Sequence, residues 1–150
     1  MNTVSMFNIS PIDGRYNNLT SELNGIFSEF SFIKQRVIIE IQYFLFLLKL
    51  NTSEFPNGND ITTFMTNLSN NISVQHIKII NQIEKKIHHD VKSIEYFLTK
   101  KLQEAGFNEY INLLHFGLTS QDVNTMAYSI SILNLKKYIF SPLFETLLTN

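Results

Sequence analysis

The sequence predicts an all-α fold. Apolar residues recur at spacings of three and four along several long segments, which is the periodicity of one face of a helix. Residues that commonly begin or end helices lie between these segments. No segment sustains the alternation of apolar and polar residues that a half-buried strand requires. We therefore expect helices packed against one another.

The first long helix is expected over residues 27–50. Its apolar face consists of Phe27, Phe30, Ile33, Val37, Ile41, Phe44, Leu45 and Leu48. The run VIIEIQYFLFLL within it is shorter than a membrane span and is interrupted by Glu40, so it indicates a buried helix. Asn, Pro and Gly in residues 51–60 predict a loop, after which Asp60 would cap a shorter helix that ends near Ser69.

Two further helices are expected over residues 72–87 and from Asp90 to Gly106. The first has isoleucines on one face, and Lys85 and Lys86 lie near its end, where the helix dipole favours cations. The second has an apolar stripe of Val91, Ile94, Phe97, Leu98 and Leu102. Asp90 is placed to cap its start, and Gly106 is suited to end it.

A last helix is expected after Gly117. Thr119, followed by Asp122 three residues later, has the form of a capping box. The apolar face is traced by Val123, Met126, Ile130, Leu133, Lys137 and Phe140, with a break expected near Pro142. We expect an amino-terminal helical domain over residues 1–113 and the incomplete start of a central helical bundle over residues 114–150, because the sequence stops inside this helix.

Composition excludes several classes of function. The 150 residues carry 12 basic and 13 acidic side chains, a formal net charge of −1, which disfavours a protein that binds nucleic acid or a membrane surface. The absence of cysteine excludes disulfides, thiolate nucleophiles and cysteine metal sites. Residues 1–8 lack the basic and apolar regions of a signal peptide. We expect a cytoplasmic protein that holds any anion through local contacts.

The stretch SPIDGRY, residues 10–16, admits two interpretations. Its proline and glycine predict a turn that leads into the first helix. Alternatively, the Arg15 guanidinium could bind a phosphate or carboxylate through two hydrogen bonds, with a ring or hydroxyl contact from Tyr16. This stretch alone does not decide between a turn and a ligand contact.

The stretch IHHDVKSIEYFL, residues 87–98, is similarly open. Asp90 could simply cap a helix, with His88 and His89 as exposed polar residues. Alternatively, His89 and Asp90 could form a pair at the positive end of a helix, suited to an anionic substrate. A metal site is disfavoured because adjacent side chains point in different directions and no third ligand is near in the sequence.

The stretch GLTSQD, residues 117–122, could be a capping box and nothing more. Alternatively, the hydroxyls of Thr119 and Ser120, with the free N–H groups of a helix start, could hold a carboxylate. A Ser–His–Asp triad is disfavoured because the Gly-x-Ser-x-Gly elbow is absent. His76 and His115 lie in or beside apolar helical patterns, so we expect packing residues with a satisfied nitrogen.

Taken in order, ISPIDGRY, GIFSEF, HHDVKSIEYFL and HFGLTSQDVN resemble the amino-terminal part of bacterial-type adenylosuccinate lyases, in the fumarase/aspartase superfamily. The resemblance covers residues 9 to at least 142. It implies mostly helical subunits whose second domains form a long central bundle in a homotetramer, with active sites assembled from different subunits. It also implies elimination of fumarate from adenylosuccinate, giving AMP, and from the succinocarboxamide ribonucleotide of purine synthesis, without a cofactor or metal.

The resemblance also implies roles for the three stretches. Arg15 and Tyr16 resemble the pair that holds the nucleotide end of the substrate. Thr119 and Ser120 match the Thr-Ser that hydrogen-bonds the succinyl or fumarate carboxylate, where donors directed at charge stabilise the transition state.

His89 and Asp90 match the family's His-Asp, in which the histidine touches the substrate and is an auxiliary catalytic residue. His88 departs from the asparagine that close relatives have at this position. Its side chain can still donate a hydrogen bond to the substrate.

The main acid and base of the family have no counterpart in this sequence. The family's general-acid histidine lies in a Thr-His-Gly-Gln-like motif, and its serine base lies in a loop of the Ser-Ser-x-Met-Pro-x-Lys-x-Asn type. We therefore expect a chain that carries substrate-binding residues and is inactive alone. Two alternatives stay open: a helical interaction module of a split or relic lyase, and a superfamily lyase that forms fumarate from another substrate.

Overall fold

The computed structural model describes residues 10–51 and 58–149. Within these ranges there is no β-strand, so the all-α prediction is confirmed. Most of the loop expected over residues 51–60, and the segment 1–9, lie outside the described residues. The elements are α1 (Asn17–Thr20), η1 (Ser21–Leu23), α2 (Asn24–Phe27), α3 (Glu29–Leu50), α4 (Gly58–Asn70), α5 (Val74–Ile87), α6 (Asp90–Glu104), η2 (Asn108–Leu113), α7 (Ser120–Leu135), η3 (Lys136–Phe140) and α8 (Ser141–Thr149).

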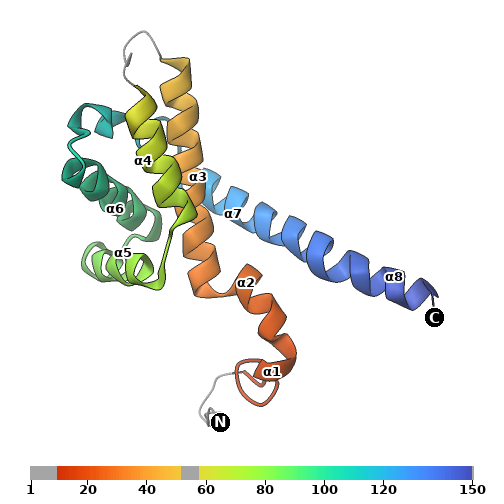
Figure 1. Ribbon diagram of the computed structural model, residues 1–150. Helices are drawn as coiled ribbons and strands as arrows, with labels where there is room; N and C mark the ends of the chain where they lie inside the picture. Colours follow the sequence, from red (N-terminus) through yellow and green to blue (C-terminus); the bar gives the residue numbers. More distant parts are fainter. Residues whose placement is uncertain (1–9, 52–57, 150) are drawn as a thin grey trace.

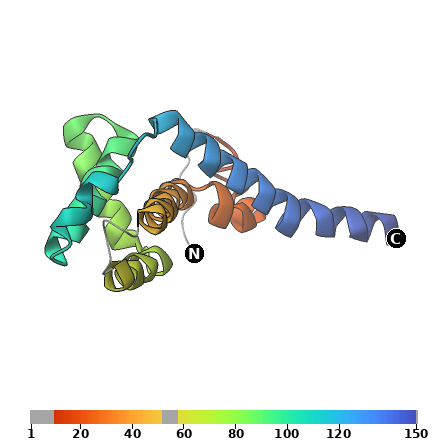
Figure 2. The ribbon, with the colours of Figure 1, turned by 90° about the horizontal axis from the view of Figure 1, so that it is seen from above.

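The long helix α3 is the centre of the molecule (Figure 1). Helix α4 runs beside it, and α5 and α6 form a pair on the same side of the body. Helix α7 packs across α3, and its continuation through α8 extends away from the body as an arm, which is also clear from above (Figure 2). The structure therefore has a compact helical body and one projecting helical arm.

Two apolar clusters hold this arrangement together. The larger cluster joins α3, α4, α5 and α6 and includes Phe44, Met65, Ile80, Phe97 and Leu98, each at most 1% exposed. The smaller cluster consists of Ile39, Val91, Val123 and Ala127, and it joins α3 to the first turns of α6 and α7. Burial of apolar surface fixes the relative positions of these helix starts, which carry the candidate residues His89, Asp90, Thr119 and Ser120.

The observed helix boundaries differ from the expected ones by a few residues. Helix α3 begins at Glu29, because Ser28 is extended and its hydroxyl accepts a hydrogen bond from the Ser31 N–H at 3.2 Å. Phe27 therefore belongs to α2. Asp60 lies in the first turn of α4 and is not its cap, because α4 begins two residues earlier, at Gly58.

The last helix departs from a simple amphipathic helix. It changes to a π-helical turn over Lys136–Phe140, just before Pro142, which agrees with the expected break. Of the expected apolar face, Val123 is buried, whereas Leu133 is 62% exposed. The buried line is Val123, Ala127 and Ser131, since only the first part of this helix packs on the body.

Candidate functional site

The SPIDGRY stretch forms a compact turn. The Gly14 N–H donates to the Ser10 carbonyl at 3.0 Å, and the Tyr16 N–H donates to the Pro11 carbonyl at 2.9 Å. The Arg15 guanidinium lies 4.7 Å from the centre of the Tyr16 ring, and both residues are exposed. The predicted turn is confirmed, and it leaves a cation stacked on an aromatic ring in contact with solvent.

His89, and not Asp90, caps α6. His89 is extended, and its Nδ1 accepts a hydrogen bond from the Lys92 N–H at 3.1 Å. Asp90 is the first residue of the helix, and its carboxylate is drawn to Arg36 of α3, where Oδ2 accepts from Nη2 at 2.7 Å. The prediction that Asp90 caps this helix is wrong, because this tertiary ion pair and the histidine nitrogen share the work expected of one carboxylate.

His88 ends α5 in the left-handed conformation, with φ of 54°. It lines a hollow of about 470 Å³ together with Glu29, Asn81, Glu84 and Lys85. A neighbouring hollow of about 420 Å³ contains Ile12 and Asp13 of the SPIDGRY turn, and Glu29 lines both hollows. The structure therefore brings the SPIDGRY turn and His88 to adjoining hollows, neither of which is lined by Thr119 or Ser120.

The capping box at the start of α7 is confirmed. The Asp122 carboxylate accepts from the Thr119 N–H at 2.7 Å and from the Thr119 hydroxyl at 2.9 Å. These hydrogen bonds, the backbone one first, lower the pKa of Asp122. Ser120 is the first residue of the helix and is half-buried, and across the described ranges its hydroxyl makes no hydrogen bond.

Helix α3 connects these separate stretches through four side chains spaced along one face, Phe32, Arg36, Glu40 and Tyr43, which we call the α3 stripe. Arg36 binds Asp90, as described above. Glu40 Oε1 lies 2.6 Å from Nδ1 of His115, and the Tyr43 hydroxyl donates to the Phe116 carbonyl at 2.9 Å. The α3 stripe thus fixes both the start of α6 and the segment before α7.

The charges around His115 form a small network. Its Nε2 lies 3.9 Å from Oε1 of Glu95, and Glu95 Oε2 accepts from Nζ of Lys92 at 2.7 Å. Glu40 is fully buried, and burial raises the pKa of its carboxyl, although the hydrogen bond and charge of His115 act in the opposite direction. The hydrogen bond to Glu95 raises the pKa of Lys92.

Both remaining histidines are packing residues with a nitrogen partner, as expected. His76 lies 5.6 Å from the Phe97 ring centre, and its Nδ1 accepts from the Ser73 N–H at 3.3 Å. His115 has 14% of its side chain exposed. Sequence reasoning missed its partner, Glu40, although a carboxylate inside the run VIIEIQYFLFLL was a signal that a buried partner was needed.

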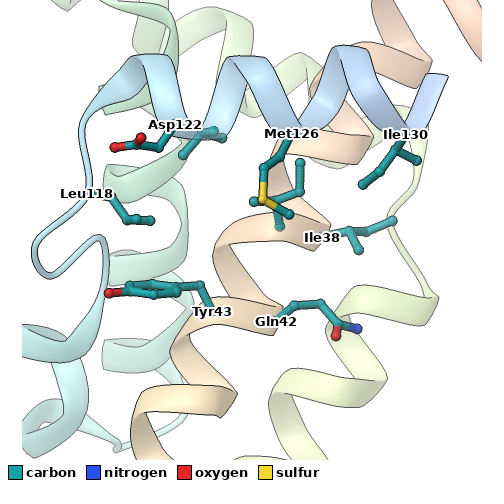
Figure 3. Close-up of a pocket in the computed structure, with 9 residues that line it drawn as sticks. Ile38, Gln42, Tyr43, Leu118, Asp122, Met126 and Ile130 are labelled. Atoms are coloured by element: carbon teal, nitrogen blue, oxygen red, sulfur yellow. The ribbon is translucent and has the colours of Figure 1, made fainter. Parts of the chain in front are cut away.

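An apolar groove lies between α3 and α7, beside the capping box (Figure 3). Its volume is about 410 Å³, and its lining includes Ile38 and Tyr43 on one side and Leu118, Met126 and Ile130 on the other. The groove offers few polar groups, so it does not suit a charged substrate. Among the described residues, no group of three or more His, Asp or Glu side chains could hold a metal ion, and no helix is long and apolar enough to cross a membrane.

Comparison with known proteins identifies the family. No family model matches the sequence. The chain is 38% identical over 144 residues to the adenylosuccinate lyase of Buchnera aphidicola subsp. Baizongia pistaciae, covering 95% of this chain and 31% of that protein. It is 37% identical over 139 residues to that of Dictyostelium discoideum and 30% identical over 154 residues to that of Escherichia coli, covering 89% and 99% of this chain and 30% and 33% of those proteins. The chain belongs to the adenylosuccinate lyase family.

This chain spans about a third of the length of the adenylosuccinate lyases that it matches. The expectation of an amino-terminal portion of the adenylosuccinate lyase family is thereby confirmed. The roles of the individual candidate residues stay predictions.

Proposed function

We propose that this chain supplies substrate-binding residues to an adenylosuccinate lyase, which eliminates fumarate from adenylosuccinate and from the succinocarboxamide ribonucleotide. The observation that carries the proposal is the identity of 36–38% to three Buchnera adenylosuccinate lyases over nearly the whole chain. In this reaction a base removes a proton beside a carboxylate and an acid protonates the leaving nitrogen. The main acid and base would come from residues beyond these 150, so the chain alone should be inactive.

Arg15 and Tyr16 would hold the nucleotide end of the substrate. The exposure of both side chains supports this role, because a guanidinium in contact with solvent is free to bind a phosphate through two parallel hydrogen bonds. The stacking of Arg15 on Tyr16 restricts the guanidinium before the ligand arrives.

His89 would act as a hydrogen-bond donor to the substrate. Its Nδ1 accepts from the Lys92 N–H, so the neutral ring carries its proton on Nε2. Half of the side chain is exposed, which leaves that donor available. Asp90, fixed by Arg36, would hold the position of the His-Asp pair, and His88 would donate from its own hollow in place of the family's asparagine.

Ser120 would make the more direct contact to the succinyl or fumarate carboxylate. The Thr119 hydroxyl already donates to Asp122, whereas the Ser120 hydroxyl is free to donate, and both lie at the positive end of α7. Thr119 would contribute chiefly by fixing the start of this helix.

The assembled protein would be a homotetramer without a cofactor or metal, located in the cytoplasm. Residues 1–113 would form the amino-terminal domain, and residues 114–150 would begin the central helical bundle. The projection of α8 from the body supports this division, because a bundle helix requires partner helices along its length.

The experiment is adenylosuccinate cleavage, followed by the change in absorbance, for the chain alone and for the chain mixed with a carboxy-terminal piece of a related lyase. Activity only in the mixture would support the proposal, and an Arg15→Ala chain in the same mixture should then show a raised KM. Activity of the chain alone would contradict our account of the missing acid and base, and inactivity of a mixture that demonstrably assembles would argue against the binding role.

A second candidate is a helical interaction module. The arm carries exposed apolar side chains that favour association, namely Ile132, Leu133, Tyr138, Phe140, Leu143, Phe144, Leu147 and Leu148. Sedimentation of the purified chain tests this candidate, and a monomer at micromolar concentration would exclude self-association. Turnover of argininosuccinate but not adenylosuccinate in the mixture described above would instead favour another lyase of the superfamily.

A further inference from the structure

The segment that precedes α7 has an unusual backbone. We call residues 114–119 the connector, because they join η2 to α7. His115 has φ of 55° and Gly117 has φ of 73°, so two of its residues are left-handed. The conformation costs little for glycine, but a histidine adopts it only when its surroundings hold it. The connector is therefore held by contacts from elsewhere in the fold.

Two of these contacts come from the α3 stripe. Glu40 Oε1 meets His115 Nδ1 at 2.6 Å, and the Tyr43 hydroxyl donates to the Phe116 carbonyl at 2.9 Å. Glu40 and Tyr43 are three residues apart and lie on one face of α3, so a rigid helix holds two consecutive connector residues. Within the connector, the Leu118 N–H donates to the His115 carbonyl at 3.2 Å and closes the turn.

The contact between Glu40 and His115 requires a proton. A carboxylate oxygen and an unprotonated nitrogen repel each other at 2.6 Å, so a proton lies between Oε1 and Nδ1. The neighbouring charged groups are Glu95 and Lys92 of α6, which also face this pair. Glu40 is fully buried, and its Oε2 has no partner in the described part of the chain, so loss of His115 would leave a buried carboxylate uncompensated.

We propose that Glu40 is a positioning residue, which fixes His115 by hydrogen bonding and thereby holds the connector in the one geometry that presents Thr119 and Ser120 at the start of α7. The functional meaning of this inference rests on the proposed contact of Ser120 with a substrate carboxylate. The positioning itself does not depend on that contact, and it has its own readout.

The test compares three variants of the full chain with the wild type by ¹⁵N NMR. The wild type should show His115 protonated at Nδ1. Glu40→Gln keeps an acceptor oxygen and should preserve this state, whereas Glu40→Leu removes the acceptor and should shift the proton to Nε2. Phe44→Leu is the matched control, because it weakens the main core on the same helix and leaves the Glu40–His115 pair intact.

Amide hydrogen exchange reports the connector directly. In Glu40→Leu, exchange at the Leu118 and Asp122 amides should become about tenfold faster relative to core amides, because the connector opens locally. Glu40→Gln and Phe44→Leu should leave this ratio unchanged. Wild-type ratios in Glu40→Leu, a Glu40→Gln variant that behaves like Glu40→Leu, or a wild-type His115 without a proton on Nδ1 would each overturn the proposal.

Fumarate is the probe that separates this inference from the proposed function. A shift of the Ser120 amide on fumarate addition, requiring about tenfold more fumarate in Glu40→Leu than in Glu40→Gln, would support both. If fumarate moves the Ser120 amide in none of the proteins, the proposed role of Ser120 fails, while the NMR and exchange results still decide the positioning role. Equal fumarate affinity in all variants would overturn the link between Glu40 and the site.

Discussion

Arg36 of α3 donates from Nη2 to Oδ2 of Asp90 at 2.7 Å and so joins the central helix to the first residue of α6. The same guanidinium lies 4.1 Å from the centre of the Phe32 ring, which packs at 4.5 Å against the Tyr128 ring of α7. One buried arginine therefore participates in the contacts that hold two helix starts with candidate site residues. This relationship leads to the first of five predictions.

Replacement of Arg36 should destabilise the fold. Its side chain is 10% exposed and that of Asp90 is 39% exposed, so the pair is partly screened by water and Arg36→Ala should cost about 1–3 kcal/mol in the free energy of unfolding. Arg36→Lys should recover part of this loss, because it keeps the charge but not the planar stacking. Lys49→Ala removes an exposed cation of the same helix and should change stability by less than about 0.5 kcal/mol in urea unfolding. Equal losses for Arg36→Ala and Lys49→Ala would contradict the prediction.

Glu40 should make the protein less stable as the pH rises. Burial raises the pKa of its carboxyl above the ordinary value of 4.5, so the folded protein binds this proton more tightly than the unfolded chain does. The resulting stability is fully present below pH 4.5 and is lost as the pH rises through the folded pKa. Urea unfolding at a series of pH values should show the wild type losing stability relative to Glu40→Gln over this range. Parallel curves for the two proteins would refute it.

Asp122 should have the opposite effect at lower pH. Hydrogen bonds from the Thr119 N–H and then the Thr119 hydroxyl hold the pKa of this carboxyl below its ordinary value of 3.8. Its contribution to stability is present above pH 3.8 and is lost as the pH falls through the lower folded pKa. Asp122→Asn should remove this part of the acid transition in circular dichroism, and an unchanged acid transition would show that the capping box does not titrate as described.

Thr119 and Ser120 should separate stability from binding. Thr119→Ala removes the capping hydroxyl of α7 and should cost about 0.5–2 kcal/mol of stability. Ser120→Ala should leave stability within about 0.5 kcal/mol while weakening fumarate or substrate binding. Ser129→Ala, on the exposed side of the same helix, is the control for binding. Calorimetric or NMR titration measures the affinities, and normal affinity in Ser120→Ala would remove this residue from the site.

His89 should show a similar separation within one side chain. Its Nδ1 caps α6, and the proposed ligand contact uses Nε2. His89→Asn supplies another good capping side chain, so it should preserve stability, whereas His89→Ala should cost about 1 kcal/mol. Both variants should lower activity in a mixture with a complementary lyase piece. Full activity of His89→Asn in an assembled mixture would show that Nε2 makes no important contact.

Much of the fold and part of the site follow from local sequence. The periodic apolar residues of 27–50 and 91–102 predicted α3 and α6, because a helix must bury one face. Thr119 and Asp122 predicted the start of α7, because a capping box is made by residues three apart. The resemblance carried by the SPIDGRY, HHD and GLTSQD stretches predicted the family, which the curated relatives confirm.

The sequence by itself determined the helices, the SPIDGRY turn and the family, since those depend on residues that are neighbours in the chain. Only the tertiary structure decided what Asp90 and Glu40 do. Asp90 gave up the cap of α6 to pair with Arg36, and Glu40 meets a histidine 75 residues later in the chain. Such pairs form because a carboxylate withdrawn from water must find a partner, and which partner is within reach depends on how the helices pack and not on local sequence.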